Sequence, residues 1–269
     1  MTTPPPTIEA VLTAIGPCVV ACSGGIDSML LACVAHRLAP QTTVIAHAVS
    51  PAVPAEATQR VHDYAAREGW TLRIVRSGEF GDENYLANPV HRCYFCKSNL
   101  YESLAAIAQG MAGAGTIVSG TNVDDLGEYR PGLNAAAERQ VRHPWVEAGY
   151  AKEDIRARAR SLGLSIAELP ASPCLASRLY SGTRVTPTRL AAVEAAEALV
   201  RSQTGLGVVR CRVRGETMLI ETPAEGRALV TPSLLEEVAR LVTNLTPEIA
   251  GVQLDDKPYQ PGRAFAVPA

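Results

Sequence analysis

Apolar and polar positions change between two periods along the first two thirds of the chain. Short apolar, partly β-branched runs, typical of strands, lie at residues 17–22, 42–49, 71–75 and 116–119. Segments with apolar residues at helical spacing lie at residues 27–38, 55–68, 98–109 and 152–162. Strands that alternate with helices are joined by right-handed crossovers and form a parallel sheet covered on both faces. The pattern predicts an α/β fold with a doubly wound parallel sheet.

A different order of elements follows beyond residue 180. Helical spacing at residues 187–201 precedes two strand-like runs at 207–214 and 218–221, and a further helix is predicted at 232–242. This order predicts a small α+β domain. We therefore expect a main domain over residues 1–178 and a smaller domain over residues 179–269.

The two ends of the chain carry few structure signals. Residues 1–10 contain three consecutive prolines and no cationic stretch before an apolar run, so we expect a disordered lead-in and no signal peptide. The tail from residue 255 contains three prolines and is expected to be irregular. Apolar stretches such as residues 11–22 are interrupted by Gly16 and Pro17 and fall short of the roughly 18 residues that a membrane span needs.

Composition narrows the class of partner. The 269 residues are 47% hydrophobic and carry a formal charge of −2, with a pI near 6.2. This near-neutral charge leaves no excess of positive side chains to bind the phosphate backbone of a nucleic acid along many nucleotides. We expect a cytoplasmic protein that acts on a small molecule and binds neither nucleic acid nor a membrane.

Seven cysteines, an odd number without an export signal, favour reduced thiols over a disulfide framework. Four of them lie among apolar residues, where a thiol behaves as a small hydrophobe: Cys18, Cys22, Cys33 and Cys211. The polar surroundings of Cys93, Cys96 and Cys174 make these three the candidates for chemistry.

A glycine turn connects the first predicted strand to its helix, in the string Ser23-Gly24-Gly25-Ile26-Asp27-Ser28. Backbone N–H groups and the positive helix end converge on an anion at such a turn. The string lacks the Gly-Lys-Ser/Thr ending of a Walker A loop and is not G-x-G-x-x-G. It resembles the signature of the PP-loop ATP pyrophosphatases, which cleave ATP to AMP and pyrophosphate. The resemblance implies that Ser23, Gly24, Gly25, Asp27 and Ser28 hold the pyrophosphate of ATP with Mg²⁺, and that Asp27 is catalytic.

A second loop, Gly120-Thr121-Asn122-Val123-Asp124-Asp125, follows another predicted strand. It therefore lies at the carboxyl edge of the sheet, where open α/β sheets bind ligands. Adjacent acids in a loop are also common on solvated surfaces. The PP-loop resemblance assigns Gly120 and Asp125 to the nucleotide.

Three longer strings narrow the resemblance. They are Arg92-Cys93-Tyr94-Phe95-Cys96-Lys97, the stretch 120–132 with Asp124-Asp125-Leu126-Gly127-Glu128-Tyr129-Arg130-Pro131-Gly132, and Cys174-Leu175-Ala176-Ser177-Arg178. Together, over residues 19–221, they resemble the LarE sulfur transferases, which make pyridinium-3,5-bisthiocarboxylic acid mononucleotide for the nickel-pincer nucleotide of lactate racemase. The resemblance implies that a carboxylate is activated as an acyl-adenylate, that Cys174 handles sulfur, and that the chain forms a homo-oligomer.

Two versions of the sulfur chemistry exist in that family. A lone cysteine gives up its own sulfur and becomes dehydroalanine, or three cysteines hold a 4Fe-4S cluster that carries an extra sulfide. Thiolates at i and i+3 can face one metal site, and three ligands on a cubane leave one iron open. We favour a cluster on Cys93, Cys96 and Cys174, recharged by a sulfur donor, over sacrifice of Cys174. Structural zinc, completed by His91 and Cys174, remains an alternative.

The smaller domain contributes the predicted substrate residues. Arg212-Val213-Arg214 and Ile220-Glu221 resemble the family's Arg-x-Arg and Ile-Glu elements, and alternate strand residues share a face. The residues assigned to the mononucleotide substrate are Ser177, Arg178, Arg212 and Arg214 for its phosphate, with Glu197 and Glu221 as further contacts. Two departures weaken the match in detail: Leu169-Pro170 stands where Lys-Pro is expected, and residues 256–262 depart from the family's ending.

Other readings of the motifs remain open. PP-loop tRNA thiolases also combine such a loop with cysteine pairs, although this chain lacks a basic extension. An ammonia-using ligase related to NAD synthetase would leave Cys174 without a role, and a regulatory module with structural zinc would bind ATP without cleaving it. Carboxylate-dependent release of pyrophosphate excludes the regulatory module, and full turnover by Cys174→Ala favours the ligase.

Overall fold

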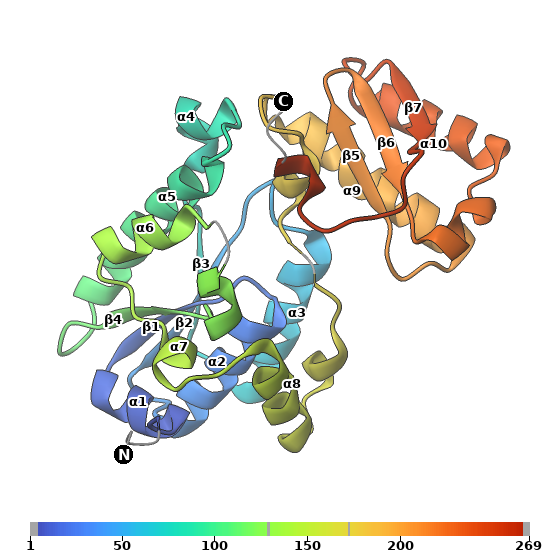
Figure 1. Ribbon diagram of the computed structural model, residues 1–269. Helices are drawn as coiled ribbons and strands as arrows, with labels where there is room; N and C mark the ends of the chain where they lie inside the picture. The colour runs from blue at the N-terminus through green and yellow to red at the C-terminus, as the bar shows by residue number, and fades with distance from the viewer. Residues whose placement is uncertain (1–4, 128–129, 172, 266–269) are drawn as a thin grey trace. The chain divides into compact units, whose positions relative to one another are not determined.

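A computed structural model describes residues 5–127, 130–171 and 173–265. Residues 1–4 of the expected lead-in, Glu128 and Tyr129 of the second family string, and residues 266–269 of the tail lie outside the described residues. The chain divides into two compact units, and each contains a sheet of its own (Figure 1). Unit 1 comprises Met1–Glu79 and Cys93–Pro173, and unit 2 comprises Phe80–Arg92 and Cys174–Ala269.

Unit 1 is built on a four-stranded parallel sheet of order β3-β2-β1-β4. Its strands are β1 (Cys18–Ala21), β2 (Thr43–Ala48), β3 (Leu72–Val75) and β4 (Thr116–Ser119). In the centre, Val20 of β1 pairs with Ile45 of β2 and Val118 of β4. The predicted parallel α/β fold is thereby confirmed.

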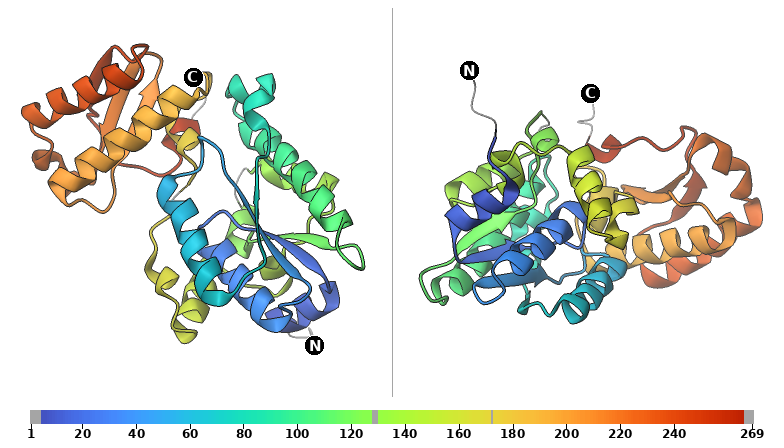
Figure 2. Two further views of the ribbon diagram at one scale, coloured as in Figure 1. Left: turned by 180° about the vertical axis from the view of Figure 1, so that it is seen from behind. Right: turned by 90° about the horizontal axis from the view of Figure 1, so that it is seen from below.

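Helices cover both faces of this sheet, as Figures 1 and 2 show. Because side chains alternate along a strand, Cys18 and Val20 of β1 join one buried cluster and Val19 and Ala21 join another. The first cluster also receives side chains from α1 (Ile8–Ile15), α2 (Ile26–Leu38), α3 (Ala55–Glu68), α7 (Pro144–Glu147) and α8 (Lys152–Ser161). The second receives them from α5 (Arg92–Gln109) and α6 (Gly132–Glu138).

Unit 2 contains a mixed three-stranded sheet of order β5-β6-β7. β5 (Arg210–Arg214) pairs antiparallel with β6 (Thr217–Glu221), and β6 pairs parallel with β7 (Gly251–Leu254). The helices α9 (Pro187–Thr204) and α10 (Pro232–Leu245) pack on each other and on the sheet. This arrangement is the small α+β fold that the sequence predicts.

Residues 80–92, which include α4 (Glu83–Leu86), belong to unit 2 although they precede most of α5. The buried Asn88 attaches them there. Its Nδ2 donates to the carbonyl oxygen of Tyr180 at 2.9 Å and to that of Thr183 at 2.8 Å. Arg92 reaches the carbonyl oxygen of Ala176 at 2.9 Å, so the last part of the segment is fixed at two positions.

The sequence expectations need several corrections. Residues 8–10 are not a disordered lead-in, because Thr7 caps helix α1 by accepting from the backbone N–H of Ala10 at 3.2 Å, and Ile8 is fully buried. Helix α5 begins at Arg92 rather than at residue 98, which places the cysteine pair inside the helix. The elements α4, α6, α7 and β7 were not predicted. Among the described residues, no helix is both long and apolar enough to cross a membrane.

Candidate functional site

The predicted phosphate loop lies between β1 and α2 in unit 1, as the sequence suggested. At two glycines, neighbouring backbone atoms approach too closely to leave room for a side chain. Gly24 has φ +83°, and a Cβ there would lie 2.8 Å from the carbonyl oxygen of Ala57. A Cβ on Gly120, at the end of β4, would lie 2.7 Å from the backbone nitrogen of Ser28. The two predicted nucleotide loops therefore touch backbone to backbone.

Side chains inside the loop fix its shape. The buried Ser28 hydroxyl accepts from the backbone N–H of Ser23 at 3.0 Å and donates to the carbonyl oxygen of Gly25 at 3.1 Å. From α7, the indole N–H of Trp145 donates to the carbonyl oxygen of Asp27 at 3.0 Å. The loop is thus held in one conformation by the protein itself, which reduces the ordering cost of binding an anion.

Asp27 carries an unsatisfied acceptor into this region. Its Oδ1 is buried and has no hydrogen-bond partner. Burial raises the pKa of Asp27, the negative charge of Asp125 raises it further, and the positive charge of Lys152 opposes the shift. A divalent cation would coordinate the unpartnered Asp27 oxygen and relieve the repulsion between the Asp27 and Asp125 carboxylates. Two carboxylates are ligands of the kind that fits Mg²⁺.

Asp125 is the second carboxylate of the site and is largely buried. It forms ion pairs with Arg130 at 2.9 Å and with Lys152 at 3.3 Å. The backbone N–H of Lys152 also donates to Asp124 Oδ2 at 2.8 Å, which docks the start of α8 on the second loop. Sequence reasoning missed Lys152, because no local signal connects a residue at a helix start with an acid 27 positions earlier.

Asn122, between the two predicted nucleotide residues, was quoted in the motif but given no role. Its side chain is fully buried, its Oδ1 accepts from the backbone N–H of Asp124 at 3.1 Å, and its Nδ2 has no partner. A buried donor without an acceptor costs stability, and a bound water or ligand could supply the acceptor that Asn122 Nδ2 lacks here.

The end of β4 carries a further polar cluster that the sequence did not single out. The Ser119 hydroxyl lies 2.8 Å from His143 Nδ1 and 3.0 Å from the Thr121 hydroxyl. Burial lowers the pKa of His143, so the imidazole is neutral near pH 7. This cluster anchors the strand end from which Gly120 and Asn122 follow.

The three candidate cysteines belong to different units. Cys93 and Cys96 stand one turn apart near the start of α5 and are partly exposed, in unit 1. Cys174 is exposed in unit 2, where it caps a short 3₁₀ helix, Leu175–Arg178. All seven cysteines are thiols. Within the described part of the chain, no three His, Cys, Asp or Glu side chains gather into a group that could hold a metal.

Arg178 and Glu197 form the centre of the predicted substrate site in unit 2. Arg178 Nε lies 2.9 Å from Glu197 Oε1, and Arg178 Nη2 lies 3.1 Å from Glu197 Oε2. Arg178 Nη1 also donates to the carbonyl oxygen of Cys174 at 3.2 Å and to the Ser177 hydroxyl at 3.1 Å. Four of the predicted residues, Cys174, Ser177, Arg178 and Glu197, are therefore in one hydrogen-bonded group.

Arg212 and Glu221 form a second buried pair across β5 and β6. Arg212 Nε lies 2.9 Å from Glu221 Oε2, and its Nη1 reaches the carbonyl oxygen of Ser177 at 3.2 Å. Arg263 from the tail pairs with the other oxygen of Glu221 at 3.0 Å. Arg214 is exposed at the end of β5, with its guanidinium 5.7 Å from the centre of the Tyr180 ring. The two arginines of the Arg-x-Arg element thus have different surroundings.

Arg210 is a buried cation that the sequence reasoning overlooked, although it stands two residues before Arg212 on the same strand. Its guanidinium lies 5.5 Å from the centre of the Tyr259 ring. Burial lowers the pKa of Arg210, and the charge of Arg178 lowers it further. Positive charges held close together in a low-dielectric region attract an anion.

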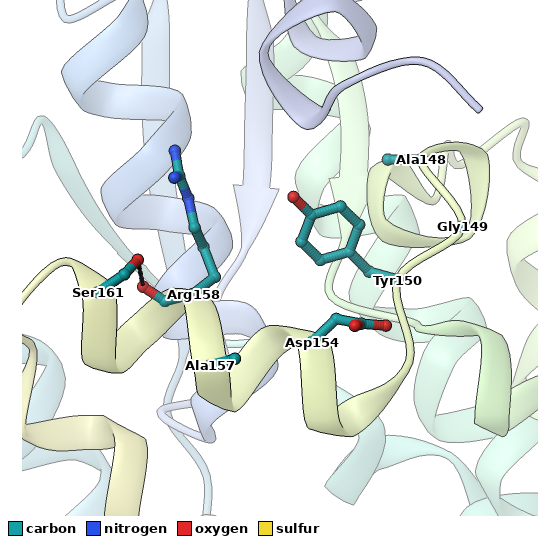
Figure 3. A pocket seen from close by; sticks show the side chains of 7 residues that line it. All are labelled: Ala148, Gly149, Tyr150, Asp154, Ala157, Arg158 and Ser161. Carbon is teal, nitrogen blue, oxygen red and sulfur yellow. Dashed lines mark hydrogen bonds between the residues drawn. The ribbon is translucent and has the colours of Figure 1, made fainter. Parts of the chain in front are cut away.

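A separate pocket of about 510 Å³ lies on unit 1 (Figure 3). It is lined by Ala148, Gly149, Tyr150, Asp154, Ala157, Arg158 and Ser161. None of the predicted site residues belongs to this lining. The pocket is therefore distinct from the phosphate loop.

Comparison with known proteins finds similarity to a named synthase. No protein-family model matches the sequence. The chain is 32% identical to the pyridinium-3,5-bisthiocarboxylic acid mononucleotide synthase of Lactiplantibacillus plantarum over 218 residues, which cover 81% of this chain and 78% of that protein.

Two uncharacterized proteins are similar as well. One from Synechocystis sp. is 38% identical over 247 residues, covering 91% of this chain and 90% of that protein. The other, from Methanocaldococcus jannaschii, is 27% identical over 203 residues, covering 76% of each. Neither name adds a function.

Proposed function

This chain belongs to the LarE family of pyridinium-3,5-bisthiocarboxylic acid mononucleotide synthases, and from that membership we propose that it is an ATP-dependent, AMP-forming sulfur transferase. Its proposed substrate is pyridinium-3,5-biscarboxylic acid mononucleotide, and its proposed role is the biosynthesis of the nickel-pincer nucleotide. The observation that carries the proposal is the likeness to the named synthase over four fifths of the chain.

The first proposed step is adenylation of a substrate carboxylate. A carboxylate is a poor electrophile, because its oxide is a poor leaving group. An oxygen of the carboxylate attacks the α-phosphorus of ATP, the bond to the bridging oxygen breaks, and pyrophosphate leaves with that electron pair. The product is a mixed anhydride whose acyl carbon a sulfur nucleophile can attack.

The loop residues in unit 1 support this step. The amides around Gly24 and Gly25, with the hydroxyl of Ser23, would bind the pyrophosphate portion of ATP. Asp27 and Asp125 would hold Mg²⁺, which neutralises charge on the departing pyrophosphate when bound. Lys152 adds a positive charge beside Asp125.

The buried arginines in unit 2 support the assignment of a mononucleotide. Burial and then the charge of Arg178 lower the pKa of Arg210, and a phosphate dianion beside it would stabilise the charged guanidinium against both effects. Arg178 and Arg212 are already held in place by their carboxylate partners, so their guanidinium planes are oriented before a ligand arrives. We propose Arg210, Arg212 and Arg214 as phosphate contacts, with Ser177 beside them.

For sulfur delivery we propose that Cys93, Cys96 and Cys174 hold a 4Fe-4S cluster. The support is the chemistry of the donors: two partly exposed thiols one helical turn apart in unit 1 and an exposed thiol in unit 2, although the described residues do not gather the three into one group. When bound, the cluster supplies an exchangeable sulfide as the sulfur atom of the product, and a sulfur donor replaces it.

A sacrificial role of Cys174 is the second candidate, and the exposure of its thiol favours it. The Cys174 thiolate would attack the acyl carbon and expel AMP, giving a thioester. Loss of the Cα proton and cleavage of the Cβ–S bond would then release the thiocarboxylate and leave dehydroalanine at position 174. Atoms and electrons balance without an oxidant or a reductant.

Anaerobically purified protein, incubated with ATP, Mg²⁺ and the biscarboxylic mononucleotide, tests both candidates. We expect substrate-dependent release of pyrophosphate and AMP, bound iron, and loss of product formation but not of pyrophosphate release in Cys174→Ala. An iron-free, active protein in which residue 174 loses the elements of hydrogen sulfide would establish sacrifice instead. Absence of pyrophosphate release would overturn the proposed function.

A further inference from the structure

Helix α3 contacts the phosphate loop at the point where the chain turns. Arg60 Nη1 donates to the carbonyl oxygen of Gly24 at 2.6 Å. Ala57 of the same helix occupies the space beside Gly24 where a Cβ would stand. Neither contact belongs to the loop string itself, and the sequence gives no reason to connect residue 60 with residue 24.

The contact with Arg60 fixes the orientation of one peptide group. In a trans peptide the C=O and the following N–H point in opposite directions. Because the Gly24 carbonyl points to Arg60, the N–H of Gly25 points away from α3. Its contact within the loop is a long one, 3.4 Å to the Ser23 hydroxyl, so the amide retains capacity for an anion. A reversed peptide would present a carbonyl oxygen there and repel a phosphate.

His47 fixes the preceding part of the same turn. Its Nδ1 lies 2.8 Å from the carbonyl oxygen of Cys22, and its Nε2 lies 3.0 Å from the Thr58 hydroxyl of α3. A carbonyl oxygen can only accept, so Nδ1 carries the proton and Nε2 accepts from Thr58 in the neutral ring. The residues on both sides of Ser23 are therefore attached to α3.

We propose that Arg60 is a positioning residue for the phosphate loop: it holds the Gly24 carbonyl outward so that the Gly25 amide faces the pyrophosphate portion of ATP. This inference rests on the proposed function, because it assumes that the loop binds ATP. It predicts a selective effect, since AMP lacks the β- and γ-phosphates that the loop would hold.

The test compares three variants by calorimetric binding of Mg²⁺-ATP, pyrophosphate and AMP to the whole chain. Arg60→Met removes the donor, and we expect ATP and pyrophosphate to bind about tenfold more weakly while AMP binding changes less than about twofold. Arg60→Lys keeps a charged donor and should recover part of the loss. Arg37→Met is the matched control, because Arg37 joins α2 to Glu68 of α3 at 2.8 Å.

The outcomes separate this inference from the proposed function. If wild type binds ATP but Arg60→Met weakens ATP and AMP equally, or leaves both unchanged, Arg60 does not orient the loop amide. If wild type binds no ATP, the proposed function itself fails. A fall in affinity for both nucleotides together with a lower melting temperature would identify a purely structural role and overturn the proposal.

Discussion

Arg178 and Glu197 form a bidentate ion pair in unit 2, with each residue only 2% exposed. Glu197 Oε1 also accepts from the backbone N–H of Cys211 at 3.1 Å. Removing one partner of a buried pair leaves an uncompensated charge, which costs about 3–5 kcal/mol. We expect Glu197→Ala to lower the free energy of unfolding of unit 2 by that amount in urea titrations.

A matched exposed pair provides the control. Arg160 and Glu168 lie 2.7 Å apart in unit 1, but both side chains are more than half exposed. Because solvent screens such pairs, Glu168→Ala should change the free energy of unfolding far less than Glu197→Ala does. Glu197→Gln keeps an acceptor for the Cys211 N–H, so its loss of unfolding free energy should lie between those of Glu197→Ala and Glu168→Ala. Equal effects of Glu197→Ala and Glu168→Ala would show that the buried pair is not formed.

The close approach of the two nucleotide loops makes a second prediction. In Gly120→Ala the new Cβ would meet backbone atoms of Ser28 and Asp27 at 2.7–2.9 Å, and backbone atoms cannot move aside easily. We expect a loss of about 1–3 kcal/mol, measured by urea unfolding. Gly25→Ala is the comparison, because its Cβ would meet only the Ser23 hydroxyl, at 3.6 Å, and it should cost less than about 0.5 kcal/mol. A neutral Gly120→Ala would contradict the packing of the loops.

The thiols should differ in reactivity according to burial. Cys174 is exposed, whereas burial raises the pKa of Cys22 to about 11 and that of Cys33 to about 12. Only the thiolate reacts with iodoacetamide, so metal-free protein at pH 8 should be modified first at Cys174. Mass spectrometry of peptides after timed quenching measures this order. Modification of Cys22 or Cys33 before unfolding would show that the core around α2 opens.

The sequence predicted the parallel fold because strand and helix periods alternate clearly in unit 1. It missed α1, since the prolines before Thr7 suggested disorder although Thr7 and the spacing of Ile8, Val11 and Leu12 were available signals. It missed β7 (Gly251–Leu254), because Gly-Val-Gln-Leu begins with a glycine and lacks the consecutive β-branched residues that mark residues 116–119.

The phosphate loop could be located from the sequence because its residues are contiguous. The partners that shape it could not, because Arg60, Trp145 and Lys152 come from other elements and meet the loops only after folding. The partners of the substrate arginines could not be predicted either. Arg212 pairs with Glu221 because of the register between β5 and β6, and residue spacing does not define that register.

Asp27 should make stability depend on pH. Its folded pKa lies above the 3.8 of an ordinary carboxyl, first because of burial and then because of Asp125. The folded state therefore holds the proton more tightly than the unfolded chain, and stability falls as pH rises from 3.8 through the folded value. The new side chain of Asp27→Asn is neutral at every pH, so the stability of this variant does not fall in this way as the pH rises. We expect the metal-free variant to unfold at higher urea concentration than wild type at pH 7.

The same variant should lose activity. If Asp27 holds Mg²⁺ as proposed, Asp27→Asn should release pyrophosphate roughly 10²-fold more slowly or worse at saturating ATP. A variant that is more stable but turns over more slowly is expected when the replaced side chain, here Asp27, is needed for activity and its charge destabilises the fold. A variant that is less stable than wild type at pH 7 would show that Asp27 is not destabilised by burial.

Two neighbours of Asp27 should shift its titration in opposite directions. The positive charge of Lys152 favours the Asp27 carboxylate and lowers its pKa, whereas the negative charge of Asp125 raises it. Lys152→Met should therefore move the pKa of Asp27 upward and Asp125→Asn should move it downward, as followed by the ¹³C shift of the Asp27 carboxyl in metal-free protein. Lys152→Arg keeps the charge and should leave the titration near that of wild type. Shifts of the same sign in Lys152→Met and Asp125→Asn would mean that a change of packing, and not charge, sets the proton affinity. Opposite shifts would establish that α8 and the loop after β4 tune the acid in the phosphate loop through charge.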